Sequence, residues 1–229
     1  LNEGMPEIYD RGLAICFDAN GLYRKVEVRH ERKDVIYRSG PANGTDYTPC
    51  CKLAKTTDKR LLKAVKNLLD SGELDPPDQQ WMGKTIENYE QNMMAIWEEV
   101  TEQAKNAQID GKNHRGYVFW AKSGNGYTEP LYKWEGVKRH LIQSVLANWE
   151  NRGGYRNHGS CFVCGGIKEP VFGNFSMLSC YNLDKAGSIA GGFKEEYGVK
   201  NFPVCKRCAI MVSGAVIRVE KDLTSTMAG

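Results

Sequence analysis

The sequence predicts an α+β fold, with mixed hairpins and helices followed by a cysteine-rich module at the carboxyl-terminal end. Three features of the 229 residues predict it: alternating apolar residues around a turn in the first thirty positions, two stretches of helical spacing, and two Cys-x-x-Cys pairs in the last third. No internal repeat or heptad array competes with this interpretation. With 41% hydrophobic residues, the chain can bury the core of one large domain or two small ones.

The first predicted element is a β-hairpin over residues 13–28. Apolar and polar residues alternate in "LAICFDANGLYRKVEV", and Asn20-Gly21 is a typical tight-turn pair. A third strand is expected in "DVIYR", residues 34–38. The turn-rich stretch Ser39 to Pro49 then predicts a loop, which is either a working surface or a plain connection.

Two helices follow this loop. The first is expected from Thr57 or Asp58, as its cap, to Leu69, because leucines and Val65 recur at helical spacing. The stretch "DPPDQQ", residues 75–80, predicts a break before the second helix. One apolar stripe defines that helix and is typical of a core-facing side: Ile86, Tyr89, Met93, Trp97 and Val100.

A second hairpin and a third helix complete the first predicted domain. Residues 116–134 read as strand, turn at Ser123 to Gly126 and returning strand, and Trp134 to Glu150 has helical periodicity. The Gly- and Asn-rich stretch after it favours a domain boundary. We therefore predict an α+β domain over residues 1–152 and a metal module over residues 153–229.

Charge is distributed unevenly along the chain, although the net charge is only +3. Residues 84–102 carry one Lys and five Glu, whereas residues 105–156 carry nine Lys or Arg and four Asp or Glu. A protein that binds nucleic acid would pair such cations with phosphates and stack bases on the aromatic residues among them. The alternative is an ordinary solvent-exposed charged face whose aromatic residues are buried in the core. These aromatic residues are Tyr117, Phe119, Trp120, Tyr127, Tyr132, Trp134 and Tyr155.

The cysteine pairs predict a metal site. Two residues between cysteines place both sulfurs on one side of a tight turn, so Cys161 with Cys164 and Cys205 with Cys208 supply the four donors of a tetrahedral zinc ion. Forty residues separate the pairs and must themselves be folded; "PVFGNFSMLSC" (residues 170–180) is expected to be extended and "GGFKEEYG" (residues 191–198) to be a short helix or turn. Four thiolates close the coordination sphere, which predicts structural rather than catalytic zinc.

Other interpretations of the cysteines are weaker. A redox Cys-x-x-Cys lies in a thioredoxin-like strand and helix pattern, which this sequence lacks, and disulfides are less expected still. His158 and Cys180 are of residue types that could replace one of these ligands. Each stands alone in the sequence, however, and such residues are more often ordinary surface or core groups, so neither is included in the predicted site. Cys16, Cys50 and Cys51 lack metal spacing and are expected to pack in the core.

No candidate catalytic centre or membrane segment emerges. The sequence has no phosphate-binding P-loop, no nucleophile elbow and no clear carboxylate pair. The first ten residues lack the apolar stretch of a secretory signal, and the longest apolar stretch, residues 209–217, is about half of the ~20 residues that a bilayer needs. We expect a cytoplasmic protein that is not an enzyme and has no membrane partner.

Several segments together resemble a known family. The segments "CFVCGG", "NLDKAG" (residues 182–187) and "KNFPVCKRCAIMVSGA" (residues 200–215) resemble the zinc-binding region of the large subunit of type I-B CRISPR interference complexes. "YRSGPANGTDYTP" and "AKTTDKRLLKAV", within residues 37–65, are similar to the amino-terminal part of the same family. Such subunits are longer than this chain, so the resemblance covers their amino-terminal domain.

The resemblance implies a subunit of the Cascade surveillance complex. Its partners would be a guide RNA, target double-stranded DNA, the other Cascade subunits and a recruited helicase-nuclease. Such a large subunit reads the short PAM motif and helps open the duplex, while guide pairing supplies most of the sequence specificity.

Loop and helix residues provide candidate contacts to nucleic acid. Polar loop side chains suit base edges in a groove, and cations suit phosphate, although each candidate could equally be a turn or surface residue. The loop candidates are Asn43, Thr45, Lys122 and Asn125, and the phosphate candidates are Lys138, Arg139, Arg152 and Arg156. The alternatives are a zinc-stabilised protein-protein interaction module that does not touch nucleic acid, and an enzyme with an unrecognised site.

Overall fold

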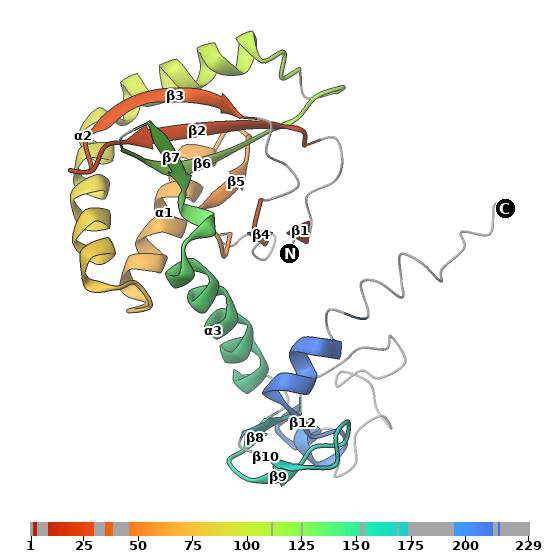
Figure 1. Ribbon diagram of the computed structural model, residues 1–229. Helices are drawn as coiled ribbons and strands as arrows, with labels where there is room; N and C mark the ends of the chain where they lie inside the picture. The colour runs from red at the N-terminus through yellow and green to blue at the C-terminus, as the bar shows by residue number, and fades with distance from the viewer. Residues whose placement is uncertain are drawn as a thin grey trace, which may run out of the picture. The chain divides into compact units, whose positions relative to one another are not determined.

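The computed structural model divides the chain into two compact units, Leu1–Ile142 and Gln143–Gly229 (Figure 1). It describes residues 2–3, 9–29, 35–38, 46–110, 112–124, 126–151, 154–168, 170–173, 195–212 and 215. The division falls inside helix α3 (Glu135–Asn151), whereas the sequence placed a domain boundary after residue 152. The α+β class predicted from the sequence is confirmed.

A five-stranded mixed sheet forms the centre of the first unit, in the order β3-β2-β6-β5, with β7 paired to β6. Strand β2 pairs with β3 antiparallel and with β6 parallel, and Ile15 lies opposite Trp120 in the parallel pair. The strands are β2 (Arg11–Phe17), β3 (Tyr23–Arg29), β5 (Cys50–Lys52), β6 (Gly116–Gly124) and β7 (Tyr127–Pro130). The first predicted hairpin is confirmed, and Gly21 adopts the positive φ of 83° that its turn needs.

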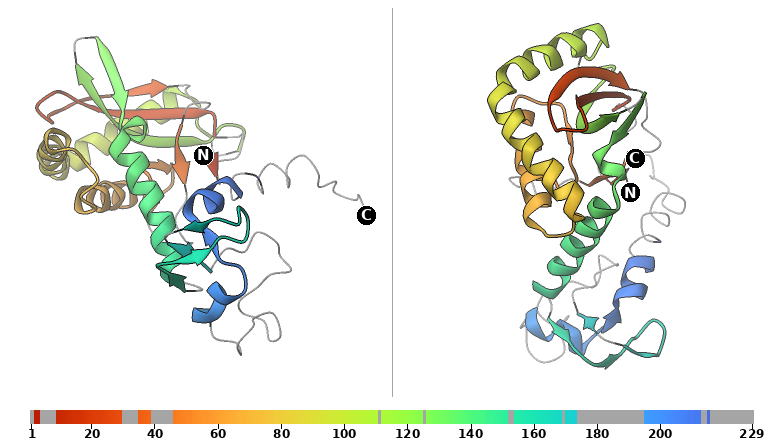
Figure 2. Two further views of the ribbon diagram at one scale, coloured as in Figure 1. Left: turned by 60° about the horizontal axis from the view of Figure 1, so that its bottom comes forward. Right: turned by 60° about the vertical axis from the view of Figure 1, so that its left-hand side comes forward.

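Two helices cover one face of this sheet, α1 (Thr57–Asp70) and α2 (Pro76–Asn106) (Figure 2). Their buried side chains share a core with Leu13, Ile15 and Phe17 of β2. Alternate residues of β2, β5 and β6 face the other way, where Tyr37 and Tyr132 cover them. Both faces are therefore buried, which explains why β2 and β6 are almost uniformly apolar.

The two helices correct the sequence analysis at their starts. Helix α1 begins at Thr57 as predicted, but the Thr57 hydroxyl lies within hydrogen-bond distance of the Lys52 and Ala54 carbonyl oxygens, to either of which it can donate, and it does not cap the helix. The predicted break before the second helix is confirmed, but it covers residues 71–75, and residues 76–80 already belong to α2. Proline suits the first turn of a helix, where its missing N–H would have no intrahelical partner.

The remaining described elements of the first unit are short. The predicted strand at residues 34–38 is reduced to β4 (Tyr37–Arg38), which pairs with β1 (Asn2–Glu3) outside the main sheet. The returning strand of the second hairpin stops at Pro130, and the 3₁₀ turn η2 (Leu131–Lys133) leads into α3. No helix within the described ranges is long and apolar enough to span a membrane.

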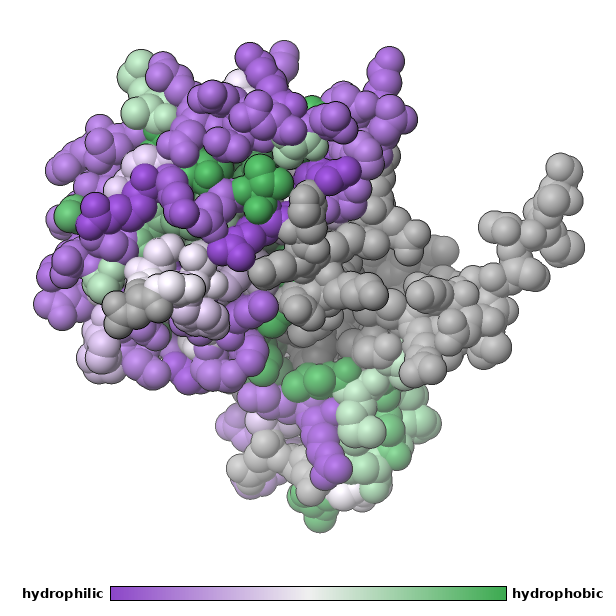
Figure 3. Space-filling view, turned by 45° about the horizontal axis from the view of Figure 1, so that its top comes forward, coloured by the Kyte–Doolittle hydropathy of each residue, from purple (hydrophilic) through white to green (hydrophobic). Residues whose placement is uncertain are grey.

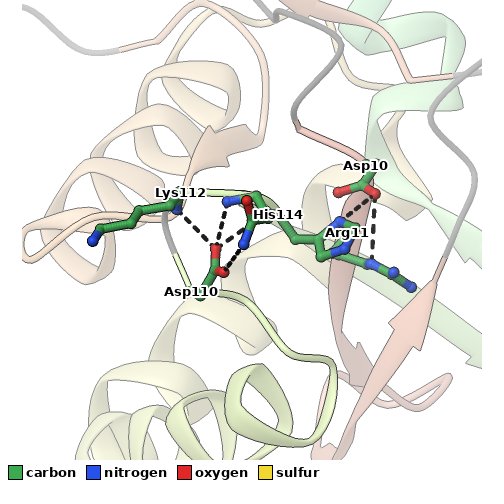
Figure 4. A network of polar contacts seen from close by, with 6 residues as sticks. Asp10, Arg11, Asp110, Lys112 and His114 are labelled. Atoms are coloured by element: carbon green, nitrogen blue, oxygen red, sulfur yellow. Dashed lines mark hydrogen bonds and ion pairs between the residues drawn. The ribbon is translucent and has the colours of Figure 1, made fainter.

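A polar network fixes the loop that leads into β6 (Figure 4). The carboxylate of Asp110 accepts the backbone N–H groups of Lys112, Asn113 and His114 at 2.8, 2.7 and 3.1 Å. These bonds lower the pKa of Asp110 to about 2. The His114 ring lies 2.8 Å from the Asp10 carboxylate, just before β2. The network therefore joins the starts of the two parallel strands.

The second unit is built from very short strands. Strand β11 (Val171–Phe172) lies between β8 (Tyr155–Arg156) and β12 (Val204–Cys205), and β9 (Gly159–Ser160) pairs with β10 (Ile167–Lys168). The predicted short helix or turn near residue 195 is the 3₁₀ helix η3 (Glu195–Lys200), and residues 206–212 are helical. The extended segment predicted over residues 170–180 contains β11, and residues 174–180 lie outside the described residues.

Candidate metal centre

The first cysteine pair occupies the turn between β9 and β10. The Cys161 N–H donates to the Gly166 carbonyl at 2.9 Å, and the Gly165 N–H donates to the Cys161 carbonyl at 2.8 Å. Gly165 has a φ of 69°, which a residue with a Cβ adopts only with strain. The glycine after the pair therefore closes the turn that directs both sulfurs toward the second cysteine pair.

The second cysteine pair joins a strand to a helix. Cys205 ends β12, and Cys208 lies in the first turn of the helical residues 206–212. The two pairs are tied together by the backbone, because the Phe162 N–H donates to the Pro203 carbonyl at 2.8 Å. The rings of Phe162 and Phe202 also pack together, with centroids 4.1 Å apart.

The four sulfur atoms converge. Those of Cys161, Cys164, Cys205 and Cys208 all lie within 4.8 Å of one another, and every residue except Cys164 is buried. Sulfurs bonded at about 2.3 Å to a tetrahedral zinc ion are separated by about 3.8 Å, a spacing that lies within this limit. The predicted cluster is confirmed as a group that could hold a metal ion.

The electrostatics of the cluster favour a cation. Burial raises the pKa of Cys161, but backbone N–H groups of Cys205, Cys164 and Val163 donate to its sulfur and lower the pKa to about 6. The Cys205 N–H lies 3.3 Å from this sulfur. Burial and the neighbouring cysteines raise the pKa of Cys208 to about 12, because a second negative charge is unfavourable beside the first. A bound cation would remove this conflict.

The other candidate ligands and cysteines lie elsewhere. His158 is exposed and does not belong to the cluster, and Cys180 lies outside the described residues. Cys16, Cys50 and Cys51 are buried in the first unit, away from metal spacing, and burial raises the pKa of Cys16 to about 11. These three cysteines pack in the core as predicted.

Four of the eight candidate nucleic-acid residues lie outside the described residues: Asn43, Thr45, Asn125 and Arg152. Lys122 is described, and it points toward aromatic rings. Its ammonium lies 5.2 and 5.5 Å from the ring centroids of Trp81 and Trp134, and 3.9 Å from the Asp78 carboxylate. This environment holds the lysine beside the core.

The three remaining candidates lie on α3 and β8. Lys138 pairs with Glu135, one helical turn earlier, and Arg139 donates to the Glu73 carbonyl at 2.6 Å and to the Asp75 carboxylate at 2.9 Å. Arg156 is exposed on β8. Lys122, Lys138 and Arg139 therefore each have an acidic neighbour, and the contacts to nucleic acid stay predictions.

The aromatic residues of the basic region are mostly core residues. Tyr117, Phe119, Trp120, Tyr132 and Trp134 are buried, in keeping with the alternative that the sequence left open. Tyr127 and Tyr155 are 64% and 52% exposed. The sequence analysis also missed the backbone donors around the Cys161 sulfur, because main-chain groups leave no residue-type signal.

Comparisons with known proteins identify the family. No curated protein and no solved structure matches the sequence. Two family models do match. That of the CRISPR-associated protein TM1802 (cas_TM1802) N-terminal domain matches residues 1–186, and that of the central domain of the same protein matches residues 158–229. The first cysteine pair falls in both matched ranges and the second pair in the central-domain range. The chain therefore belongs to the TM1802 family of CRISPR-associated proteins.

Proposed function

We propose that this chain is the amino-terminal part of the large subunit of a type I-B Cascade complex. In this role it recognises the PAM and helps open target double-stranded DNA during antiviral defence in the cytoplasm. Its partners are the guide RNA, the target DNA, the other Cascade subunits and a recruited helicase-nuclease, which cuts the DNA. Membership of a CRISPR-associated family is the observation that carries the proposal.

We propose a structural zinc ion at the four cysteines. An all-sulfur donor set suits zinc, and four protein ligands leave no open position for substrate or water. Its chemistry would be to fix the fold of the second unit. This arrangement supports a subunit that binds rather than catalyses.

The candidate residues divide into two roles in this proposal. Asn43, Thr45, Lys122 and Asn125 read base edges, whereas Lys138, Arg139, Arg152 and Arg156 bind phosphate. DNA would have to compete with Glu135 for Lys138, and with Asp75 and the Glu73 carbonyl for Arg139. It would also have to draw Lys122 away from Asp78 and the rings of Trp81 and Trp134. The ion pairs of Lys138 and Arg139 are partly solvent-accessible, and such pairs contribute about 1 kcal/mol or less.

The proposal is tested by DNA binding of the assembled complex to targets that differ only beside the protospacer. We expect Asn125→Ala to change the preference among PAM sequences. We expect Lys138→Ala to weaken binding to all of them and to lower the salt slope by about 0.9, the value for one phosphate contact on duplex DNA. Equal effects of both variants on every PAM would contradict base reading by Asn125.

Loss of the chain provides the decisive control. A complex assembled without it should bind targets with good and poor PAM motifs equally. If the complete complex also fails to discriminate between them, the proposed function is wrong. Turnover of a nucleotide or nucleic acid by the chain, abolished by a point substitution, would instead establish an enzyme.

Exposed apolar side chains favour a second candidate function, a zinc-stabilised protein-protein interaction module. Hydrophobic residues gather on the surface of the second unit (Figure 3). Five large apolar side chains within three residues of a cluster cysteine are at least 45% exposed: Phe162, Val163, Ile167, Ile210 and Met211. Such surfaces are typical of protein interfaces. A module of this kind would bind its partner without the salt dependence of phosphate contacts.

A further inference from the structure

A groove of about 590 Å³ lies between strand β3 and the β6–β7 hairpin of the first unit. Side chains of β3 and of the turn before it line one side, and the tip of the hairpin lines the other. The lining residues are Asp18, Arg24, Lys25, Glu27, Arg29, Ser123, Gly124, Gly126, Tyr127 and Thr128. Of these residues, the sequence analysis named only Tyr127 in connection with nucleic acid, among the aromatic residues that base stacking would use.

The β3 side carries more cations than carboxylates. Lys25 and Arg29 both pair with Glu27, and Arg24 pairs with Asp18. Arg24 and Lys25 remain 59% and 58% exposed. Three cations thus share two carboxylates, and two of the cations face solvent at the groove.

These cations can turn toward a ligand without leaving a carboxylate unsatisfied. Asp18 also accepts the backbone N–H groups of Asn20 and Leu22, at 2.8 and 2.9 Å. Glu27 keeps Arg29, at 2.6 Å, when Lys25 moves. The cost of redirecting Arg24 or Lys25 is therefore that of an exposed ion pair, which is small.

The hairpin side offers a ring and hydroxyl groups. Tyr127 is 64% exposed, and the hydroxyls of Ser123 and Thr128 lie 3.2 Å apart. A Cβ added to Gly124 or Gly126 would meet no atom within 4 Å, so the hairpin backbone is open to a close-lying ligand. An exposed aromatic face beside cations is the arrangement that binds unpaired bases and their phosphates.

We propose that this groove holds a single-stranded segment of nucleic acid. Arg24 and Lys25 bind successive phosphates, and one base stacks on Tyr127. The ligand is single-stranded because a paired base keeps its faces covered within the duplex. This inference depends on the proposed function, and it places the opened strand at Arg24 and Lys25, which the sequence analysis did not select.

The test measures binding of a fluorescent oligothymidylate and of a blunt hairpin duplex to the full chain over a range of salt concentrations. Two phosphate contacts predict that Arg24→Gln/Lys25→Gln lowers the salt slope for the single strand by about 1.4. Loss of one stacked base predicts that Tyr127→Ala weakens binding at least about fivefold. The matched control is Lys59→Gln/Lys63→Gln, which removes the same charge from exposed positions of α1.

The outcomes distinguish a failure of the groove proposal from a failure of the proposed function. The wild-type chain could bind the single strand while the Arg24→Gln/Lys25→Gln variant and the control variant show the same salt slope. This result overturns the groove proposal and leaves the proposed function standing. The cations would then only protect the edge of β3 from strand pairing. A wild-type preference for the duplex also overturns the groove. A wild-type chain that binds no nucleic acid overturns the groove, whereas the proposed function is decided by PAM discrimination in the assembled complex.

Discussion

The two units of this protein are held together in different ways. The first has an extensive apolar core on each face of its sheet, with Trp120, Phe17 and Tyr89 fully buried. The second has, among its described residues, a core of seven buried members, three of which are cysteines of the metal cluster. One unit depends on hydrophobic burial, and the other is built around its sulfur atoms.

This difference indicates what a bound metal ion would contribute. Among the described residues of the second unit the buried cluster is small, so a metal ion bound by its cysteines would supply an additional constraint on the fold. The constraint also permits the exposure of apolar residues such as Phe162 and Met211, because the cluster rather than their burial holds the backbone. The first unit has no such need, since both faces of its sheet are covered.

Loss of the metal should show the difference in stability between the two units most clearly. Structural zinc sites of this kind bind with about 10 kcal/mol or more, which exceeds the stability of so small a fold. We expect Cys205→Ser to release the zinc and unfold the second unit while the first stays folded. Amide hydrogen exchange followed peptide by peptide, with the zinc content measured in parallel, checks this.

Cys16→Ala is the matched control for that substitution. This cysteine is buried in the first unit and should leave both the zinc content and the exchange of the second unit unchanged. Protection of residues 154–173 and 195–212 that persists in metal-free Cys205→Ser protein would show that the second unit does not depend on its metal.

A core substitution should have the converse effect. The ring of Trp120 packs against Phe17 and Tyr89, with centroids 4.8 Å apart in both pairs. We expect Trp120→Ala to lower the free energy of unfolding of the first unit by about 3–5 kcal/mol, because it leaves a cavity, and to leave the zinc content unchanged. Urea denaturation followed by circular dichroism measures the loss.

The exposed Tyr127 offers the control for this second substitution. Tyr127→Ala removes an aromatic side chain from the same sheet at a solvent-exposed position and should change the stability by less than about 0.5 kcal/mol. Simultaneous loss of zinc in Trp120→Ala would mean that the units do not fold independently.

The sequence allowed the local elements to be predicted better than their pairing. The hairpin around Gly21 and helix α1 follow from periodicity and turn chemistry that a short window contains. Strand β5, with only three residues, has too little alternation to be recognised. The parallel pairing of β2 with β6 joins residues about a hundred positions apart, so no local pattern reports it.

The candidate site divides in the same way. Metal coordination dictates the cysteine spacing, so the four ligands could be read from the sequence. Surface cations obey no such rule. Lys122 lies beside Trp81, and Arg139 binds a segment more than sixty residues earlier. Only the fold determines which cations have acidic or aromatic neighbours.

The smallest expected effect is a gain in the stability of the first unit alone. Gly83 lies inside α2, and an added Cβ would meet no atom within 4 Å. We expect Gly83→Ala to raise the free energy of unfolding by about 0.5–1 kcal/mol, because alanine has less backbone freedom to lose on folding. The gain should appear in urea denaturation and leave the zinc affinity unchanged.

Gly136→Ala is the comparison that shows whether the effect of Gly83→Ala depends on the space around the glycine. It is also helical, but its added Cβ would lie 2.8 Å from a methyl of Leu74 and 2.9 Å from the Glu73 carbonyl oxygen. Gly136→Ala should therefore destabilise the first unit, although the intrinsic helix propensity improves equally in both variants. Opposite signs for the two substitutions would show that packing limits the first unit. A gain in both would mean that helix propensity alone sets its stability.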